Sequence, residues 1–189
     1  MPLIVGLPDY MNRDLVLLYK GDSITSRISS DLTDSGWSGG QFARWVSDGS
    51  GQPCLGMSDG RFCGFMPFGS AETGDRWTST ADQNTTYGYA VLYFGGCFFY
   101  TRIYETYGYM ARNSLGPMVP LTYTAQAKLY ISENGKITTE NESDLTVFPP
   151  HNDGDGNPVI DQDFESPGIC SVPPSAASKQ YIGVQTLGI

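Results

Sequence analysis

The stretch LTYTAQAKLYISENGKITTE, residues 121–140, has the pattern of two short β-strands joined by a tight turn. Apolar Leu129 and Ile131 precede the dipeptide Asn134-Gly135, and Ile137 follows it. Asn-Gly favours a two-residue turn of type I′, because glycine adopts positive φ freely and asparagine tolerates it. The stretch carries no nucleophile–base pair and no cluster of metal ligands. It therefore predicts a scaffold hairpin and suggests that the function lies in surfaces.

Three further segments have strand patterns. Residues 41–57 predict a second hairpin with Asp48-Gly49 as its turn signal, and residues 181–187 predict a terminal strand. Residues 87–109 are the most apolar section, and Gly95-Gly96 divides them into what we expect to be a third hairpin. Its first strand is apolar on both faces. Such a strand lies in the centre of a sandwich or places its second face against another subunit.

The composition agrees with short strands joined by turns. Of the 189 residues, 13% are aromatic and only 16% are charged, with 23 glycines and 12 prolines. We therefore predict an all-β fold, a small β-barrel or β-sandwich built from hairpins. Residues 1–35 are expected to form an extended N-terminal arm or edge segment. Residues 36–189 are expected to form the β domain, with a long acidic loop excursion at 141–174.

The charge pattern argues against several classes of partner. The formal net charge is −9, and the 11 basic residues are scattered rather than clustered. Binding to nucleic acid or to an anionic membrane is therefore not expected. The sequence has no apolar run long enough for a transmembrane helix, and its N-terminus lacks the pattern of a signal peptide. We expect synthesis in the cytoplasm, with the four cysteines as reduced structural thiols.

Catalytic chemistry has little support in the sequence. The only histidine, His151, lies in a segment rich in Pro, Asp and Gly, which is typical of an exposed loop. Glu105 is the one acid in an aromatic environment, and we expect it to pair with Arg102 or Arg112 rather than to act as a catalyst. We therefore predict no enzyme, no catalytic residue and no cofactor.

One loop contains a pattern of possible metal ligands. Asp153, Asp155 and Asn157 have the first three spacings of a calcium-binding loop, whose cation prefers clustered oxygen ligands. However, Pro158 and Phe164 stand where an EF-hand has glycine and glutamate. An acidic turn that aids solubility is the simpler interpretation, and the three residues remain candidates only.

Two segments resemble the capsid decoration (cement) proteins of tailed bacteriophages. Residues 121–140 are similar to a hairpin of that family with the pattern K-x-Y-x-S-x-x-G-K-x-T, and SKQYIGVQTLGI (178–189) is similar to its closing strand. The resemblance covers about half of the chain, and residues 87–109 and 141–174 look like additions to the family pattern. It implies a β domain that forms a homotrimer on the capsid surface and clamps neighbouring subunits of the major capsid protein. It further implies a structural virion protein that assembles in the host cytoplasm.

The expected contact surface comprises the N-terminal arm and the aromatic strands. The candidate residues are Leu15, Leu17, Tyr19, Tyr89, Tyr93, Phe99 and Tyr104. The alternative function is a receptor- or carbohydrate-binding β module of a phage fibre or tail, which would use Trp37, Trp45 or Trp77 to stack on sugars. A glycosidase is a third possibility, with the least support.

Overall fold

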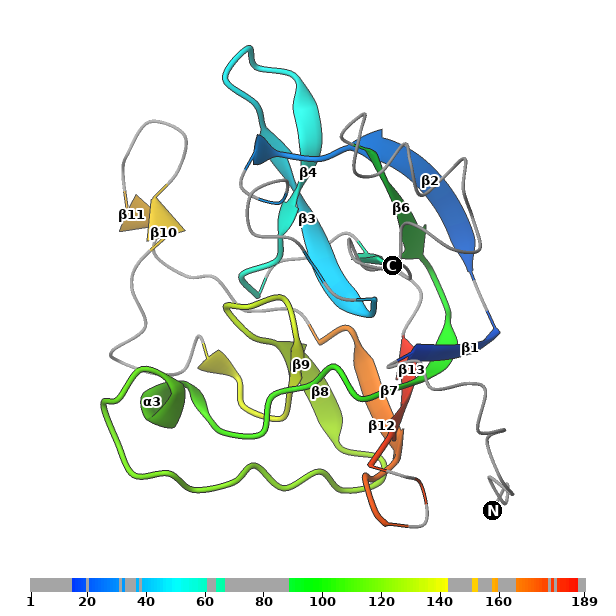
Figure 1. Ribbon diagram of the computed structural model, residues 1–189, viewed down its shortest axis with the longest axis vertical. Coiled ribbons are helices and arrows are strands. Elements are labelled where there is room, and N and C mark those ends of the chain that lie inside the picture. Colours follow the sequence, from blue (N-terminus) through cyan, green and yellow to red (C-terminus); the bar gives the residue numbers. More distant parts are fainter. Residues whose placement is uncertain are drawn as a thin grey trace.

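The computed structural model describes residues 15–19, 21–30, 32, 37, 39–60, 64–66, 89–142, 151–152, 158–159, 166–176, 178 and 180–186. In these residues the fold is all-β, with two large antiparallel sheets, a separate two-stranded pair and very little helix, including the short α3 (Tyr109–Arg112). The expected all-β class is confirmed. The sheets form a sandwich-like arrangement rather than a closed barrel (Figure 1).

The larger sheet has the strand order β1-β7-β13-β12-β8-β9. Its strands are β1 (Leu15–Tyr19), β7 (Phe98–Thr101), β13 (Ile182–Thr186), β12 (Gly168–Val172), β8 (Lys128–Ile131) and β9 (Ile137–Thr138).

The smaller sheet has the order β2-β6-β5-β3-β4. Its strands are β2 (Asp22–Arg27), β6 (Tyr89–Phe94), β5 (Gly64–Met66), β3 (Gln41–Ser47) and β4 (Pro53–Met57). A single bridge between Ile28 and Leu55 connects the chain after β2 to β4. Apart from both sheets, β10 (His151–Asn152) pairs with β11 (Pro158–Val159).

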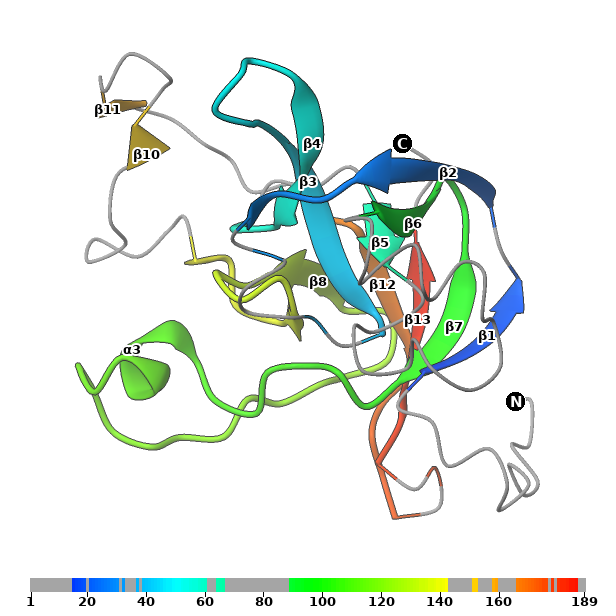
Figure 2. The same cartoon turned by 45° about the horizontal axis from the view of Figure 1, so that its top comes forward.

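One bent two-stranded ribbon contributes to both sheets. β1 pairs with β7 and β2 pairs with β6, and Leu15↔Thr101 and Arg27↔Tyr89 mark its two ends. The ribbon bends where Gly21 faces the Gly95-Gly96 corner, and Figure 2 shows β1 and β2 following each other along one side of the molecule. A Cβ at residue 21 would collide with the Phe94 carbonyl oxygen, so glycine permits the close approach.

The expected hairpin between β6 and β7 is therefore wrong. These consecutive strands lie in different sheets and pair with β2 and β1 instead of with each other. The corner is held by Thr186, whose N–H donates to the Cys97 carbonyl oxygen (2.9 Å) and whose hydroxyl accepts the Cys97 N–H (2.6 Å). The Gly95-Gly96 pair is compatible with a hairpin turn and with a bend between two sheets. The residues that decide between them lie in β1 and β2, which pair with β7 and β6.

The two remaining expected hairpins are confirmed, as β8–β9 and β3–β4. However, the β8–β9 turn is a three-residue loop, 133–135, rather than type I′. The Ser132 N–H donates to Lys136 O (2.8 Å) and the Gly135 N–H donates to Ser132 O (3.0 Å). Gly135 has φ +69°, whereas Asn134 does not adopt positive φ. This is a type I turn followed by a left-handed glycine.

The β3–β4 turn repeats this geometry. The Asp48 N–H donates to Gln52 O (2.9 Å), the Gly51 N–H donates to Asp48 O (2.9 Å), and Gly51 has φ +79°. In each hairpin the side chain of the residue just before the loop accepts backbone N–H groups of the turn. This acceptor is Ser132 Oγ in one hairpin and Asp48 Oδ1 in the other. Gly51, rather than Gly49, is thus the glycine that this turn requires.

The tip of the β8–β9 hairpin connects the two sheets. The Phe42 N–H on β3 donates to Gly135 O (2.7 Å), and Gln41 Nε2 donates to Asn134 O (2.9 Å). A Cβ at residue 135 would overlap the Met57 sulfur and lie 2.9 Å from Phe42 O. Gly135 is therefore required both for its positive φ and for this close contact.

The main core lies between the sheets, with Phe42 and Phe65 from the smaller sheet packed against Phe99 from the larger one. The rings of Phe65 and Phe99 are 4.4 Å apart. A second cluster, including Leu32, Trp37 and Leu92, covers the other face of the smaller sheet. The expectation that residues 87–94 are apolar on both faces is confirmed for β6, and both faces pack against other parts of this chain, while Tyr89 at the start of the strand is exposed.

The segment 141–174, expected to be a loop excursion, contains a strand of the larger sheet. Its residues 168–172 form β12, which lies between β13 and β8 inside the larger sheet, with Cys170 fully buried. The short sequence GICSV between two prolines is a central strand, because it pairs with a neighbouring strand on each side. The terminal strand expected at 181–187 is confirmed as β13.

Candidate functional site

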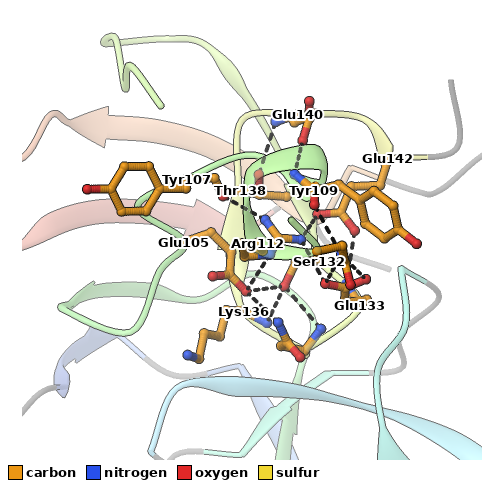
Figure 3. A network of polar contacts seen from close by, with 12 residues as sticks. Glu105, Tyr107, Tyr109, Arg112, Ser132, Glu133, Lys136, Thr138, Glu140 and Glu142 are labelled. Atoms are coloured by element: carbon orange, nitrogen blue, oxygen red, sulfur yellow. Dashed lines mark hydrogen bonds and ion pairs between the residues drawn. The ribbon is translucent and has the colours of Figure 1, made fainter. Parts of the chain in front are cut away.

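A buried polar network surrounds Arg112, the last residue of α3 (Figure 3). The guanidinium lies 3.7 Å from Glu105 (Nε to Oε1) and 3.4 Å from Glu133 (Nη2 to Oε1), and it pairs closely with Glu142. Its Nη1 donates to the Tyr107 carbonyl oxygen (2.7 Å). The expected pairing of Glu105 with Arg112 is confirmed, whereas Arg102 stacks over the Tyr181 ring at 4.5 Å.

The carboxylates come from three separate segments. Glu105 precedes α3, Glu133 lies in the β8–β9 turn, and Glu142 follows β9. Glu105 Oε1 also accepts the Ser132 hydroxyl (2.8 Å), and Glu142 Oε2 accepts the Glu133 N–H (3.1 Å). Through these bonds the network ties α3 to the hairpin.

Burial and charge act on the ionisable groups of the network. Burial raises the pKa of Glu142 to about 7, although its hydrogen bond with Arg112 acts in the opposite direction. Burial also raises the pKa of Tyr109 and of Tyr123. The Tyr123 hydroxyl shares its proton between the carbonyl oxygens of Glu105 (2.7 Å) and Ile137 (3.1 Å), which holds its side chain against the backbone of both residues.

The network has the chemistry of a structural contact rather than of a catalytic site. Ser132 is bonded to a carboxylate, as an activated nucleophile would be, but Ser132 is fully buried and no substrate could reach it. Within the described residues, no group of three or more His, Cys, Asp or Glu side chains is placed to hold a metal ion.

An open polar groove of about 770 Å³ lies on one face of the β3–β4 hairpin. It is bounded by residues 28–30 after β2, by Arg44 and Val46 of β3, and by Glu133 of the other hairpin. Its charged groups are engaged in ion pairs, with Arg44 Nη2 3.3 Å from Asp59 Oδ2. Asp48, also on its wall, has a pKa lowered to about 2, chiefly by its hydrogen bond with the Ser50 hydroxyl.

Exposed apolar side chains mark a different surface, along the β1–β2 edge. Leu18 and Tyr19 on β1 are 54% and 66% exposed, and Ile24 on β2 is 45% exposed. β1 and β2 are terminal strands of their sheets within the described part of the chain. We use the name β1–β2 edge for the surface that Leu18, Tyr19 and Ile24 form on these two strands. Such strands offer backbone hydrogen bonds to a partner strand.

The seven candidate interface residues fall into three groups. Tyr19 and Tyr89 are exposed, whereas Leu15, Leu17 and Tyr104 are half-buried against the main core. Tyr93 and Phe99 are buried in that core, so these two have no surface to offer a partner. Alternation along a strand shows which residues share a face, but it does not show which face the second sheet covers.

Some of the other candidate residues from the sequence lie outside the described residues. This holds for Asp153, Asp155 and Asn157 of the possible calcium loop and for Trp77. His151 begins β10. Of the tryptophans considered for sugar binding, Trp37 is buried in the second core cluster and Trp45 is 46% exposed on β3.

Sequence reasoning missed the roles of Glu133 and Glu142. Their spacing from Arg112 is 21 and 30 residues, which carries no local signal. It also missed a second exposed apolar group, Leu115, Met118 and Val119, although these residues stand close together in the segment SLGPMVP.

None of the helices in the described residues is long and apolar enough to cross a membrane. No protein-family model, curated protein or solved structure matches this chain.

Proposed function

We propose that this chain is a structural virion protein, a decoration subunit that binds the outer capsid lattice and stabilises contacts between major capsid subunits. The observation that carries the proposal is the β1–β2 edge, where terminal strands of both sheets expose Leu18, Tyr19 and Ile24. The resemblance of residues 121–140 and 178–189 to phage cement proteins supports the same assignment.

Edge strands suit such a role because they recognise a partner through backbone hydrogen bonds and alternating side chains. A cement protein also gains strength from repetition, since many modest contacts on a lattice act together. The partners in this proposal are the major capsid protein and further copies of the chain, as a homotrimer. The protein would be located on the virion surface after assembly in the host cytoplasm.

The test is whether the chain purifies with capsids from its biological source at a fixed ratio to the major capsid subunit. Quantitative mass spectrometry of sedimented particles measures this ratio. We expect a constant stoichiometry in virions and empty capsids, and a trimer by light scattering of the purified chain. Absence from the particles, or a ratio that varies between preparations, would contradict the proposal.

Point variants connect binding to the edge. The double variant Leu18→Ser/Tyr19→Ser should reduce co-sedimentation with capsids at least 10-fold. The matched control, Leu115→Ser/Met118→Ser, changes two equally exposed apolar residues elsewhere and should bind as the wild type does. Deletion of residues 1–20 is a poorer test because it also removes β1 from the larger sheet. Equal binding by the edge double variant and the control would refute this use of the edge.

The second candidate is a carbohydrate-binding β module, favoured by the exposure of Trp45 on β3. An exposed indole ring is a suitable platform for stacking on a sugar. Glycan-array binding that is lost in Trp45→Ala, without capsid association, would favour this function. Trp37 is unsuitable as a probe, because its substitution would disturb the core.

A further inference from the structure

The Arg112 network contains more negative than positive charge. Glu105, Glu133 and Glu142 lie within ion-pair distance of one guanidinium, so full ionisation leaves an excess of two negative charges. Glu142 is fully buried and Glu105 is 5% exposed. Buried charges that lack a counter-charge are costly, and proteins avoid them by binding a proton.

We propose that this network is a proton-operated latch, in which a proton on Glu142 tightens the contact between α3 and the β8–β9 hairpin and its loss loosens that contact. The protonated carboxyl would leave Arg112 shared between Glu105 and Glu133. Ionised Glu142 would add repulsion between its carboxylate and that of Glu133, which both lie against the same Nη2. The latch goes beyond the proposed capsid role and does not depend on it.

The groups around Glu142 favour it as the proton site. From α3 it faces Arg112 and the ring of Tyr109, and from the hairpin it faces Glu133. Lys136 extends away from it in Figure 3. Glu140, on the same segment, accepts the Tyr109 N–H (2.6 Å) instead of contacting Arg112. The elevated pKa of Glu142, about 7, agrees with this placement.

The movable part is the α3 segment. It belongs to neither sheet, and much of its attachment to the hairpin runs through Arg112, Asn113 and Tyr109. The hairpin tip is held separately by its hydrogen bonds to β3. Loosening of the network therefore releases α3 and the exposed apolar loop after it, while the sheets stay intact.

The experiment measures the titration and the motion in the wild-type chain. NMR of ¹³C-labelled glutamate carboxyl groups should show one group titrating near pH 7. Amide-exchange protection of residues 109–115, corrected for intrinsic rate, should fall between pH 5.5 and 8. The fall should be at most about 30-fold if the opened state has an ordinary glutamate pKa. Protection in β12 and β13 should stay constant.

Two variants identify the group. Glu142→Gln imitates the protonated carboxyl, so it should remove the titration near pH 7 and keep α3 protected at pH 8. Glu140→Gln is the matched control: it keeps an oxygen that can accept the Tyr109 N–H, so the pH at which α3 protection falls should stay as in the wild type. The proposal is overturned if no glutamate of the wild type titrates above pH 6. It is also overturned if α3 protection in Glu142→Gln falls with pH as in the wild type.

Discussion

Gly135→Ala provides the most direct test of how the two sheets are joined. Residue 135 has φ +69°, and an alanine in the left-handed region loses about 1–2 kcal/mol relative to its preferred conformation. The added methyl group would also overlap the Met57 sulfur and lie 2.9 Å from the Phe42 carbonyl oxygen. Overpacking of this kind costs about 1–3 kcal/mol. We therefore expect a total loss of about 2–5 kcal/mol in the free energy of unfolding.

Gly51→Ala is the matched control. Residue 51 has φ +79° in a turn of the same geometry, but a Cβ there meets no atom within 4 Å. Gly51→Ala should therefore lower the free energy of unfolding only by the cost of the left-handed backbone conformation, about 1–2 kcal/mol.

Urea unfolding followed by tryptophan fluorescence measures both variants, with equal m-values required for a direct comparison. The difference between the variants isolates the docking of the hairpin tip on β3. The reasoning is refuted if Gly135→Ala destabilises the protein no more than Gly51→Ala does.

Three further predictions concern the charged groups and the thiols. Arg112→Ala should lower the free energy of unfolding by about 3–5 kcal/mol, because it leaves buried carboxylates without their counter-charge. Arg27→Ala, which removes the exposed pair with Asp48, should cost less than about 1 kcal/mol in the same urea assay; equal losses would contradict this. Since the pKa of Asp48 is lowered to about 2, its carboxylate stabilises the turn above about pH 4, and the contribution disappears as the pH falls towards 2. The stability difference between wild type and Asp48→Asn, measured by thermal unfolding, should therefore shrink over that range; a constant difference would exclude this account. Cys54, Cys97 and Cys170 are buried, so they should react with a thiol reagent only after unfolding; rapid labelling of any of them, located by peptide mapping, would contradict their burial.

The sequence alone determined the class of the fold and several of its elements. The hairpins at 41–57 and 121–140 and the terminal strand follow from alternation and turn residues, which act between near neighbours. The same alternation predicts that β6 is apolar on both faces. Even the expected ion pair between Glu105 and Arg112 involves residues only seven positions apart in the chain.

Tertiary structure decided which strands pair and which acids meet. Gly95-Gly96 became a corner between sheets, because β6 and β7 found their partners in β2 and β1, more than 60 residues away in sequence. β12 became a central strand because β8 and β13 provide hydrogen bonds on both sides. Arg112 gathered Glu133 and Glu142 from distant positions in the same way.

The Asn134-Gly135 turn shows the boundary between the two kinds of information. Its sequence determined that the chain reverses there, since glycine accepts the positive φ that the turn needs. Its sequence did not determine the loop type or its contact with β3. Those depend on Ser132, which caps the turn, and on Phe42 and Met57, which the fold brings against Gly135 from the other sheet. Local conformational preference sets where the chain turns, and packing between distant segments sets what the turn touches.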